Sequence, residues 1–386
     1  MKKGYDDMSV LSQENKQELI LLRQEFHRIP ETEKTEEKTC QKILETLNRY
    51  GITNAKRLFH TSVVATIGKE SLPCIGLRMD IDGLPIEEKT GLPFSSQHTG
   101  RMHACGHDAH IAILLMTAKL LKKQESSLPV CVKLIFQPAE EGDGGALPMI
   151  AEGVLKDPAT TKIFGAHVWP ELPVGTVELV EGASFAGCDR FTIKFTGTGG
   201  HGALPHLANS PLYPMAACIL KLNELQKAEK KAVISPCACE AQGFYNIFPD
   251  QAQIKGTLRT LTQEDRLRIL RQMETLITEI GDEYGVSTEF LPVEEYSPCY
   301  NHPDCIREYR QAAEAVLGKS QVKTGTASFA ADDFSEFTKR CPGAHLRIGS
   351  QGGKGTSYPL HSPRFDIDEA CLWYGVEILY RLITDR

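Results

Sequence analysis

The sequence contains no long uninterrupted hydrophobic run: no window approaches ~18 consecutive apolar residues, so a membrane-spanning helix is not expected. It also lacks an excess of basic residues. The 43 Lys and Arg stand against 50 Asp and Glu, a balance that gives no support for a nucleic-acid partner. The stretch MKKGYDDMSVLSQENKQ includes two lysines with no apolar core behind them, so we expect no secretory signal and a cytoplasmic protein.

Cysteine, in contrast, is frequent. The 12 cysteines are scattered through 386 residues, unlike those of a small disulfide-stapled domain, and we expect reduced thiols that act mostly as small buried hydrophobes. Cys237 and Cys239 alternate along a strand-like run, which puts both side chains on one face. For this pair, packing is favoured over metal binding.

The length of 386 residues exceeds what one hydrophobic core usually serves, so two domains are expected. In the first half, apolar runs bounded by turn residues alternate with runs of helical periodicity. The expected strands are 63–68, 74–83, 130–137 and 162–169, and the expected helices are 16–29, 36–51, 108–123 and 146–155. This alternation predicts an α/β domain with a mainly parallel sheet covered on both faces.

From about Cys188 the pattern becomes β-α-β-β-α-β, the order of a small ferredoxin-like α+β sandwich. Its expected strands are 190–197, 231–243, 251–260 and 287–296, and its expected helices are 211–227 and 263–285. A helix at 305–318 and short segments like those of the first domain follow. We therefore expect the small domain, 188–296, to be inserted into a larger domain built from residues 1–187 and 297–386.

Polar side chains cluster where the expected strands of the larger domain end. Because ligands bind at the carboxyl ends of strands in an open α/β sheet, these side chains should meet at one rim. They are Asp80, Asp82, Glu140, Glu141 and His167. Charged groups so close to buried strands must be paired or metal-bound, since desolvating them alone costs several kcal/mol.

The stretch MHACGHDAH places one cysteine and three histidines directly before an apolar helix. Three interpretations stay open: a Cys105 nucleophile with a histidine base, a metal site, and a capped helix with incidental histidines. The metal site is favoured, because Cys105 and His107 suit a metal and it explains the carboxylates at the same rim. In PAEE, one carboxylate can bind metal while the other takes a proton from an activated water; the alternative is a solvated pair. His103 and His110 are expected to be structural.

Eight segments resemble the M20 metallopeptidase family, and within it the amidohydrolase branch of aminoacylase-like, hippurate-hydrolase-like and auxin-conjugate-hydrolase-like enzymes. They are LRMDIDGLPIEE, GRMHACGHDAH, IFQPAEEGDGGA, GAHVWPELPVGTV, GTGGHGALPH, YNIFPD, KGTLRT and LHSPRFDID. The resemblance implies that the larger domain is catalytic, that Glu140 is the general acid/base and that Asp80 orients a metal-binding histidine. It implies two divalent metal ions per chain, held by Cys105, His107, Glu141, His167 and His361.

The resemblance also implies that the inserted domain is a lid and forms a homodimer interface. It implies that His201 stabilises an oxyanion and that Asn246 and Arg259 bind the substrate carboxylate, in several relatives partly from the partner subunit. One departure is FAADDF (329–334), where Asp332 replaces a glutamate common among relatives, which puts substrate preference in question. GTGGHG matches a dinucleotide fingerprint, but the prolines after it argue against the helix that this fingerprint needs.

We thus expect a metallohydrolase that cleaves the amide bond of small N-acyl amino acids or similar conjugates. Thiolate, imidazole and carboxylate ligands suit Zn²⁺ or Mn²⁺, with Ni²⁺ or Co²⁺ also compatible. Within the same fold the alternative is a dipeptidase or aminopeptidase. From other classes, the alternatives are a non-catalytic metal-dependent binding protein and an enzyme with Cys105 as nucleophile.

Overall fold

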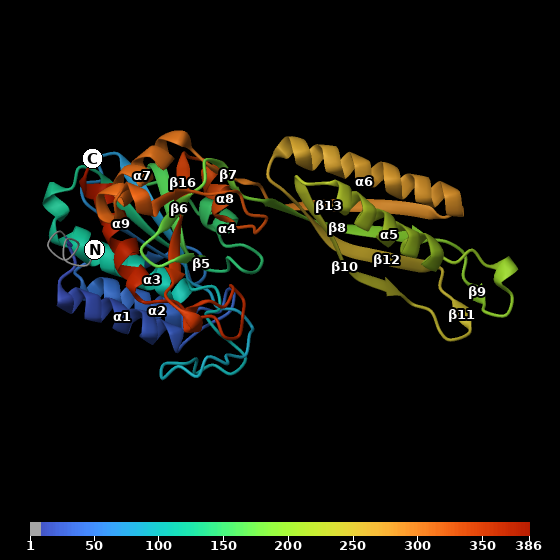
Figure 1. Ribbon diagram of the computed structural model, residues 1–386, viewed down its shortest axis with the longest axis horizontal. Helices are drawn as coiled ribbons and strands as arrows, with labels where there is room; N and C mark the ends of the chain where they lie inside the picture. Colours follow the sequence, from blue (N-terminus) through green and yellow to red (C-terminus); the bar gives the residue numbers. More distant parts are fainter. Residues whose placement is uncertain (1–8) are drawn as a thin grey trace. The chain divides into compact units, whose positions relative to one another are not determined.

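The computed structural model describes residues 9–386, which form two compact units (Figure 1). Each unit has its own hydrophobic core. Of the described residues, the larger unit contains 9–182 together with Tyr300–Thr326 and Glu336–Arg386. The smaller unit contains Ala183–Cys299 and Ala327–Ser335. Within residues 9–386, none of the helices combines the length and the apolar character that crossing a bilayer requires.

The larger unit is built on an eight-stranded sheet with the order β1-β2-β4-β3-β5-β16-β6-β15. Its strands are β1 (Lys56–Arg57), β2 (Val63–Ile67), β3 (Cys74–Asp80), β4 (Cys131–Gln137), β5 (Thr160–Pro173), β6 (Val177–Leu179), β15 (Val322–Thr324) and β16 (Gly343–Gln351). The central strands β4, β3, β5 and β16 are parallel, whereas β2 and β6 pair antiparallel with β4 and β16. The predicted mainly parallel sheet is therefore confirmed. Every residue of β3 and β4 is buried, as expected for strands covered on both faces.

Helix α3 is the central helix of the larger unit. It packs against β3 and contacts α1, α2 and α9, and its apolar run is almost wholly buried. The helices of the larger unit are α1 (Gln13–His27), α2 (Glu37–Arg49), α3 (His107–Lys123), α4 (Ala146–Ala151), α7 (Pro303–Leu317) and α9 (Ala370–Thr384). Helix α8 (Phe334–Thr338) begins in a segment of the smaller unit and ends in the larger one. Helix α4 ends at Ala151, so the prediction of a helix over 146–155 was too long.

The smaller unit has a four-stranded antiparallel sheet, order β10-β12-β8-β13, against which α5 and α6 pack (Figure 1). Pro236 and Pro292 lie on the two edge strands, where a missing N–H costs least. Its main elements are β8 (Gly187–Thr196), α5 (Leu212–Ala228), β10 (Ala232–Ala241), β12 (Gln251–Thr260), α6 (Gln263–Tyr284) and β13 (Ser287–Tyr296). The short strands β9 (Gly200–His201) and β11 (Ile247–Phe248) also belong to it, whereas β7 (Gly182–Phe185) and β14 (Cys299–Asn301) span its chain boundaries with the larger unit.

The segment Ala327–Ser335 also belongs to the smaller unit, although residues 297–386 were assigned to the larger domain from the sequence. Ser328 N–H donates to Ser184 O at 3.0 Å, and Ala186 N–H donates to Ser328 O at 3.0 Å. This backbone pairing attaches the segment to the start of the smaller unit. The sequence pattern gave no sign of it, because pairing between distant segments leaves no local periodicity.

The cysteines of the chain are all free thiols, and most of them are buried, as predicted. Cys237 and Cys239 are the exceptions, because both are exposed on the edge strand β10. The expectation that this pair packs into a core was wrong: the register of β10 shifts between Pro236 and Ala238, so simple alternation does not hold through the pair.

Candidate metal centre

A tight turn before α3 places Cys105 and His107 at the carboxyl ends of the central strands. Gly106 between them has φ +84°, and a Cβ added there would lie 2.4 Å from Val168 Cγ2, so only glycine fits. Cys105 Sγ lies 3.3 Å from Nε2 of His167 on β5. The register pairs Asp80 with Gln137 on β4, and Arg78, two residues earlier, with Gly165 on β5. The ends of β3 and β4 and the middle of β5 are therefore adjacent to one another across the sheet at this rim.

The PAEE turn after β4 brings a carboxylate to the same place. Glu141 Oε1 lies 3.0 Å from His361 Nε2 and 4.0 Å from His107 Nε2. His361 has φ +64° and is held by its own N–H, which donates to Ala104 O at 2.9 Å. Thus residues from distant parts of the chain converge around Cys105, and all of them belong to the larger unit.

The converging side chains form overlapping sets of potential ligands. In each set, one donor atom per residue lies within 4.8 Å of the others. Three of these sets are Cys105/His107/His167, Cys105/Glu141/His361 and His107/Glu140/Glu141. The structure therefore brings together all five residues expected to bind metal, with Glu140 beside them.

Buried polar atoms without hydrogen bonds test whether these residues fit a metal. Among residues 9–386, both ring nitrogens of His107 and Oε1 of Glu141 are buried and make no hydrogen bond of good geometry, although side-chain atoms of Asp82 and His361 lie 3.2 and 3.0 Å from Nδ1 and Oε1. Such atoms are costly unless a ligand satisfies them. One thiol, three imidazoles and a carboxylate form a donor set that divalent transition metals prefer. The residues present therefore fit two divalent cations.

The carboxylates of the cluster favour the binding of positive charge at this site. Burial alone would lower the pKa of His107, but Asp80 and Asp82 outweigh it and raise the pKa to about 10. Burial and the carboxylate of Glu141 raise the pKa of the Cys105 thiol well above its usual range. Without cations, the site therefore holds extra protons, and metal binding must release them.

Asp80 contacts a histidine outside the expected ligand set. Its Oδ1 lies 2.5 Å from His110 Nδ1, and its Oδ2 accepts from Arg78 Nη1 at 2.8 Å. His110 Nε2 accepts the Val168 N–H at 3.0 Å, so the ring proton must be on Nδ1 and point to Asp80. His110 is therefore structural, as expected.

Asp82 is the carboxylate nearest to Nδ1 of His107, with its Oδ1 at 3.2 Å. Asp80 lies 3.7 Å from the other nitrogen, Nε2. Asp82 Oδ2 also accepts the N–H of Glu141 at 3.0 Å, so one carboxylate contacts two of the potential ligands. The sequence analysis placed Asp82 at the rim without giving it this role.

The three expected substrate-binding residues lie in the smaller unit, but not together. His201 on β9 pairs with Ile247 on β11, and Gly202 N–H donates to Asn246 O at 2.8 Å, so His201 and Asn246 are neighbours. Arg259 lies near the other end of β12, where its Nη1 donates to Phe329 O at 3.1 Å. The distance along the extended strand from Gln251 to Arg259 is about 26 Å.

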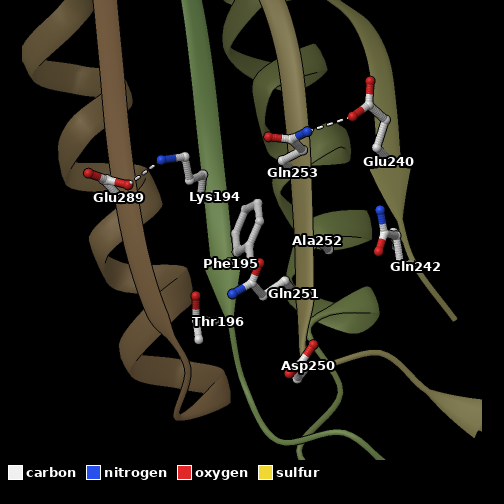
Figure 2. Close-up of a pocket in the computed structure, with 11 residues that line it drawn as sticks. Lys194, Phe195, Thr196, Glu240, Gln242, Asp250, Gln251, Ala252, Gln253 and Glu289 are labelled. Carbon is white, nitrogen blue, oxygen red and sulfur yellow. Dashed lines mark hydrogen bonds and ion pairs between the residues drawn. The ribbon is translucent and has the colours of Figure 1, made fainter.

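Two cavities differ in their relation to this chemistry. A cavity of about 500 Å³ on the smaller unit is lined mostly by polar side chains, some of which pair with one another (Figure 2). Lys194 Nζ lies 2.9 Å from Glu289 Oε2, and Gln253 donates to Glu240 (Figure 2). A cavity of about 300 Å³ in the larger unit includes Asp82 and Glu141 in its lining and so adjoins the potential ligands.

Comparisons with known proteins agree with this site. The family model described as peptidase family M20/M25/M40 matches residues 76–385. N-acetylcysteine deacetylase of Bacillus subtilis (strain 168) is 36% identical over 366 residues, covering 92% of this chain and 93% of that protein. N-acetyldiaminopimelate deacetylase of Geobacillus sp. (strain WCH70) is 34% identical over 377 residues, covering 95% and 97%. The crystal structure of Bacillus subtilis YXEP, a dinuclear metal-binding peptidase from the M20 family, matches with a TM-score of 0.84 at 32% identity, covering 96% and 98%.

Proposed function

The chain belongs to the peptidase family M20/M25/M40, and on that premise we propose that it is a metal-dependent amidohydrolase of N-acyl amino acids or similar small conjugates. The observation that carries the proposal is the convergence of five potential metal ligands beside a further carboxylate, Glu140. The deacetylases of similar sequence support the substrate class.

Cys105, His107, Glu141, His167 and His361 would hold two divalent cations, Zn²⁺ or Mn²⁺ by the chemistry of their donor atoms, with Ni²⁺ or Co²⁺ also admitted. The chemistry that such cations supply when bound is activation of a water molecule and polarisation of the amide carbonyl. Asp82 fixes the ring of His107 through Nδ1, so that Nε2 faces Glu141.

Glu140 is the proton carrier of the proposed reaction. It is half-buried and shares a cluster with His107 and Glu141, but it is not needed to complete the ligand set. Its carboxylate accepts the proton of the attacking water and later donates it to the leaving amine, so that one residue serves as base and then as acid.

The smaller unit supports a homodimer in which the partner completes the site. Asn246 lies just before the start of β12 and Arg259 lies near its end, about 26 Å further along the strand. A single small substrate therefore cannot contact both residues of one chain. Arg259 pairs with Cys188, close to where the chain enters the smaller unit, so we assign Arg259 to the substrate of its own subunit and His201 and Asn246 to that of the partner.

An exposed apolar surface near β9 and β11 is consistent with such a dimer, since monomers rarely leave large apolar patches uncovered. Tyr245 is fully exposed and Phe244 is 69% exposed. Other exposed apolar side chains in the segments around these strands are Leu204, Leu207, Ile247 and, at the start of α5, Tyr213.

Glu140→Gln tests the proposed function. With a panel of N-acetyl amino acids as substrates, we expect kcat to fall by roughly 10²–10⁴-fold, because the amide cannot carry the proton. Calorimetric titration of the chelator-treated protein with Zn²⁺ or Mn²⁺ should show unchanged binding. Glu152→Gln, an exposed glutamate after α4, is the matched control and should retain full activity.

Other outcomes distinguish the alternatives. An active Glu140→Gln variant would contradict the assignment of the base. Activity that survives chelation would favour a Cys105 nucleophile, and faster hydrolysis of dipeptides than of N-acetyl amino acids would favour a dipeptidase.

A further inference from the structure

The turn that carries Glu140 and Glu141 begins with a strained residue. Ala139 has φ +58°, a left-handed conformation that residues other than glycine rarely adopt. Its carbonyl accepts the Gly144 N–H at 3.1 Å, which closes a tight loop after β4. Ala139 is completely buried, so surrounding groups must hold it in this conformation. The directions of the next two side chains depend on it.

Glu36, from the segment between α1 and α2, contacts this residue. Its Oε1 accepts the N–H of Ala139 at 3.0 Å and the N–H of Lys34 at 3.0 Å. Its Oε2 accepts from Thr61 Oγ1 at 2.5 Å. Glu36 is 0% exposed, and these three partners are uncharged donors.

Glu36 is the N-cap residue of α2, yet its side chain does not cap that helix. Glu31 does so instead: its Oε2 accepts from both N and Oγ1 of Thr39, at 2.9 and 3.1 Å. The usual function of a polar N-cap side chain is therefore supplied by another acid, which leaves the Glu36 carboxylate for Ala139.

Keeping a carboxylate at this position is costly. Burial and the nearby charge of Asp82 raise the pKa of Glu36 to about 7, although its hydrogen bonds oppose the shift. A residue that only filled space here could be apolar. The cost is consistent with a specific need for a hydrogen-bond acceptor at the Ala139 amide.

We propose that Glu36 is a positioning residue that holds Ala139 in its left-handed conformation and thereby aims Glu140 and Glu141. This inference rests on the proposed function for the role of Glu140. Its structural part, the orientation of a ligand carboxylate, can be tested without any substrate.

Two variants of Glu36 and one control test the proposal. Glu36→Ala removes the acceptor, and kcat as well as Co²⁺ affinity should fall by roughly 10–100-fold, the usual effect of losing a group that orients a ligand. Glu36→Gln keeps an acceptor oxygen toward Ala139 and should stay close to the wild type. Glu31→Ala removes a comparably buried carboxylate, 5% exposed, from the same segment and should leave both values unchanged.

The Co²⁺ measurement uses chelator-treated protein, titrated while the thiolate–Co²⁺ absorption from Cys105 is recorded. Hydrogen–deuterium exchange of the peptide spanning Ala139 should accelerate in Glu36→Ala and not in Glu31→Ala. If Glu36→Ala binds Co²⁺ as tightly as Glu31→Ala, or if Glu36→Gln falls as far as Glu36→Ala, the proposal is overturned.

A rescue experiment separates positioning from a general loss of stability. Glycine adopts positive φ readily, so Ala139→Gly added to Glu36→Ala should recover part of the lost Co²⁺ affinity. Absence of any recovery would contradict the proposed mechanism. If the wild type hydrolyses no N-acyl amino acid, the proposed function fails, but the Co²⁺ titrations still decide the role of Glu36.

Discussion

His27 is a buried histidine that the structure keeps charged. Its Nδ1 lies 2.8 Å from Asp108 Oδ2 and its Nε2 lies 3.3 Å from Glu88 Oε1, while Arg23 donates to Asp108 at 3.0 Å. Burial opposes the charge, but Asp108 and Glu88 raise the pKa of His27 from 6.5 to about 9. Asp108 directly follows His107, so this ion-pair network supports the first turn of α3.

The raised pKa of His27 predicts a pH dependence of stability. Its contribution is fully present below pH 6.5, the value for the unfolded chain, and is lost as pH rises through about 9. The loss is on the order of 3 kcal/mol. Urea unfolding of chelator-treated protein at pH 6.5 and 9.5 measures it. His27→Gln should reduce the difference between the two unfolding free energies by about this amount; the part that remains includes the contribution of His107, whose pKa is also raised. The exposed His206→Gln should leave the difference unchanged, and an equal difference in all three proteins would refute the prediction.

At the scale of single residues, the sequence predicted which side chains lie near the metal site but not which side chain contacts which. The spacing of Asp80 and Asp82 put both carboxylates at the rim, and nothing local distinguishes them. Which one reaches His107 depends on where α3 lies over β3, and that follows from packing between distant segments. The same holds for Glu36, whose contact with Ala139 joins residues 103 positions apart.

Among the elements, the turn before α3 has a strict steric requirement at Gly106. Gly106→Ala would combine a positive φ, which costs about 1–2 kcal/mol, with a contact of 2.4 Å to Val168. We expect a lower unfolding midpoint and a loss of Zn²⁺ affinity of at least about tenfold, because Cys105 and His107 must shift. Thermal unfolding and competition with a chromophoric chelator measure the two effects.

Gly51→Ala is the matched control for Gly106. Gly51 has φ +79°, but the nearest atom to an added Cβ is Lys122 Cε at 3.8 Å. This variant should lose stability without losing Zn²⁺ affinity. Equal Zn²⁺ affinity in the two variants would mean that the turn tolerates displacement.

The predicted elements agree best where a single periodicity runs through a whole segment. β12 (Gln251–Thr260) and β13 (Ser287–Tyr296) have the predicted bounds, because their alternation reflects one covered and one open face. β5 was predicted only as 162–169, but it extends to Pro173, since pairing with β16 continues as far as Gln351. Prolines after Trp169 hide that extension in the sequence.

At the scale of the whole molecule, the proposed exchange of His201 between subunits predicts complementation. Glu140→Gln and His201→Ala proteins should each be inactive, yet a mixture that has exchanged subunits should regain about a quarter of wild-type activity, because half of the dimers contain one complete site. Mixing Glu140→Gln with Arg259→Ala should restore nothing, since Arg259 acts in its own subunit. Recovery of activity in the second mixture would mean that Arg259 acts in the partner subunit. Absence of recovery in the first mixture would mean that His201 does not act in the partner subunit.

The exposed pair on β10 has a practical consequence for such mixing. Thiol reagents will alkylate Cys237 and Cys239 first, because the other cysteines are buried. In air, these two exposed thiols can oxidise to disulfides between molecules, and subunits joined by a disulfide no longer exchange. A Cys237→Ser/Cys239→Ser background removes this complication and leaves a molecule on which a single fluorophore can be placed by design.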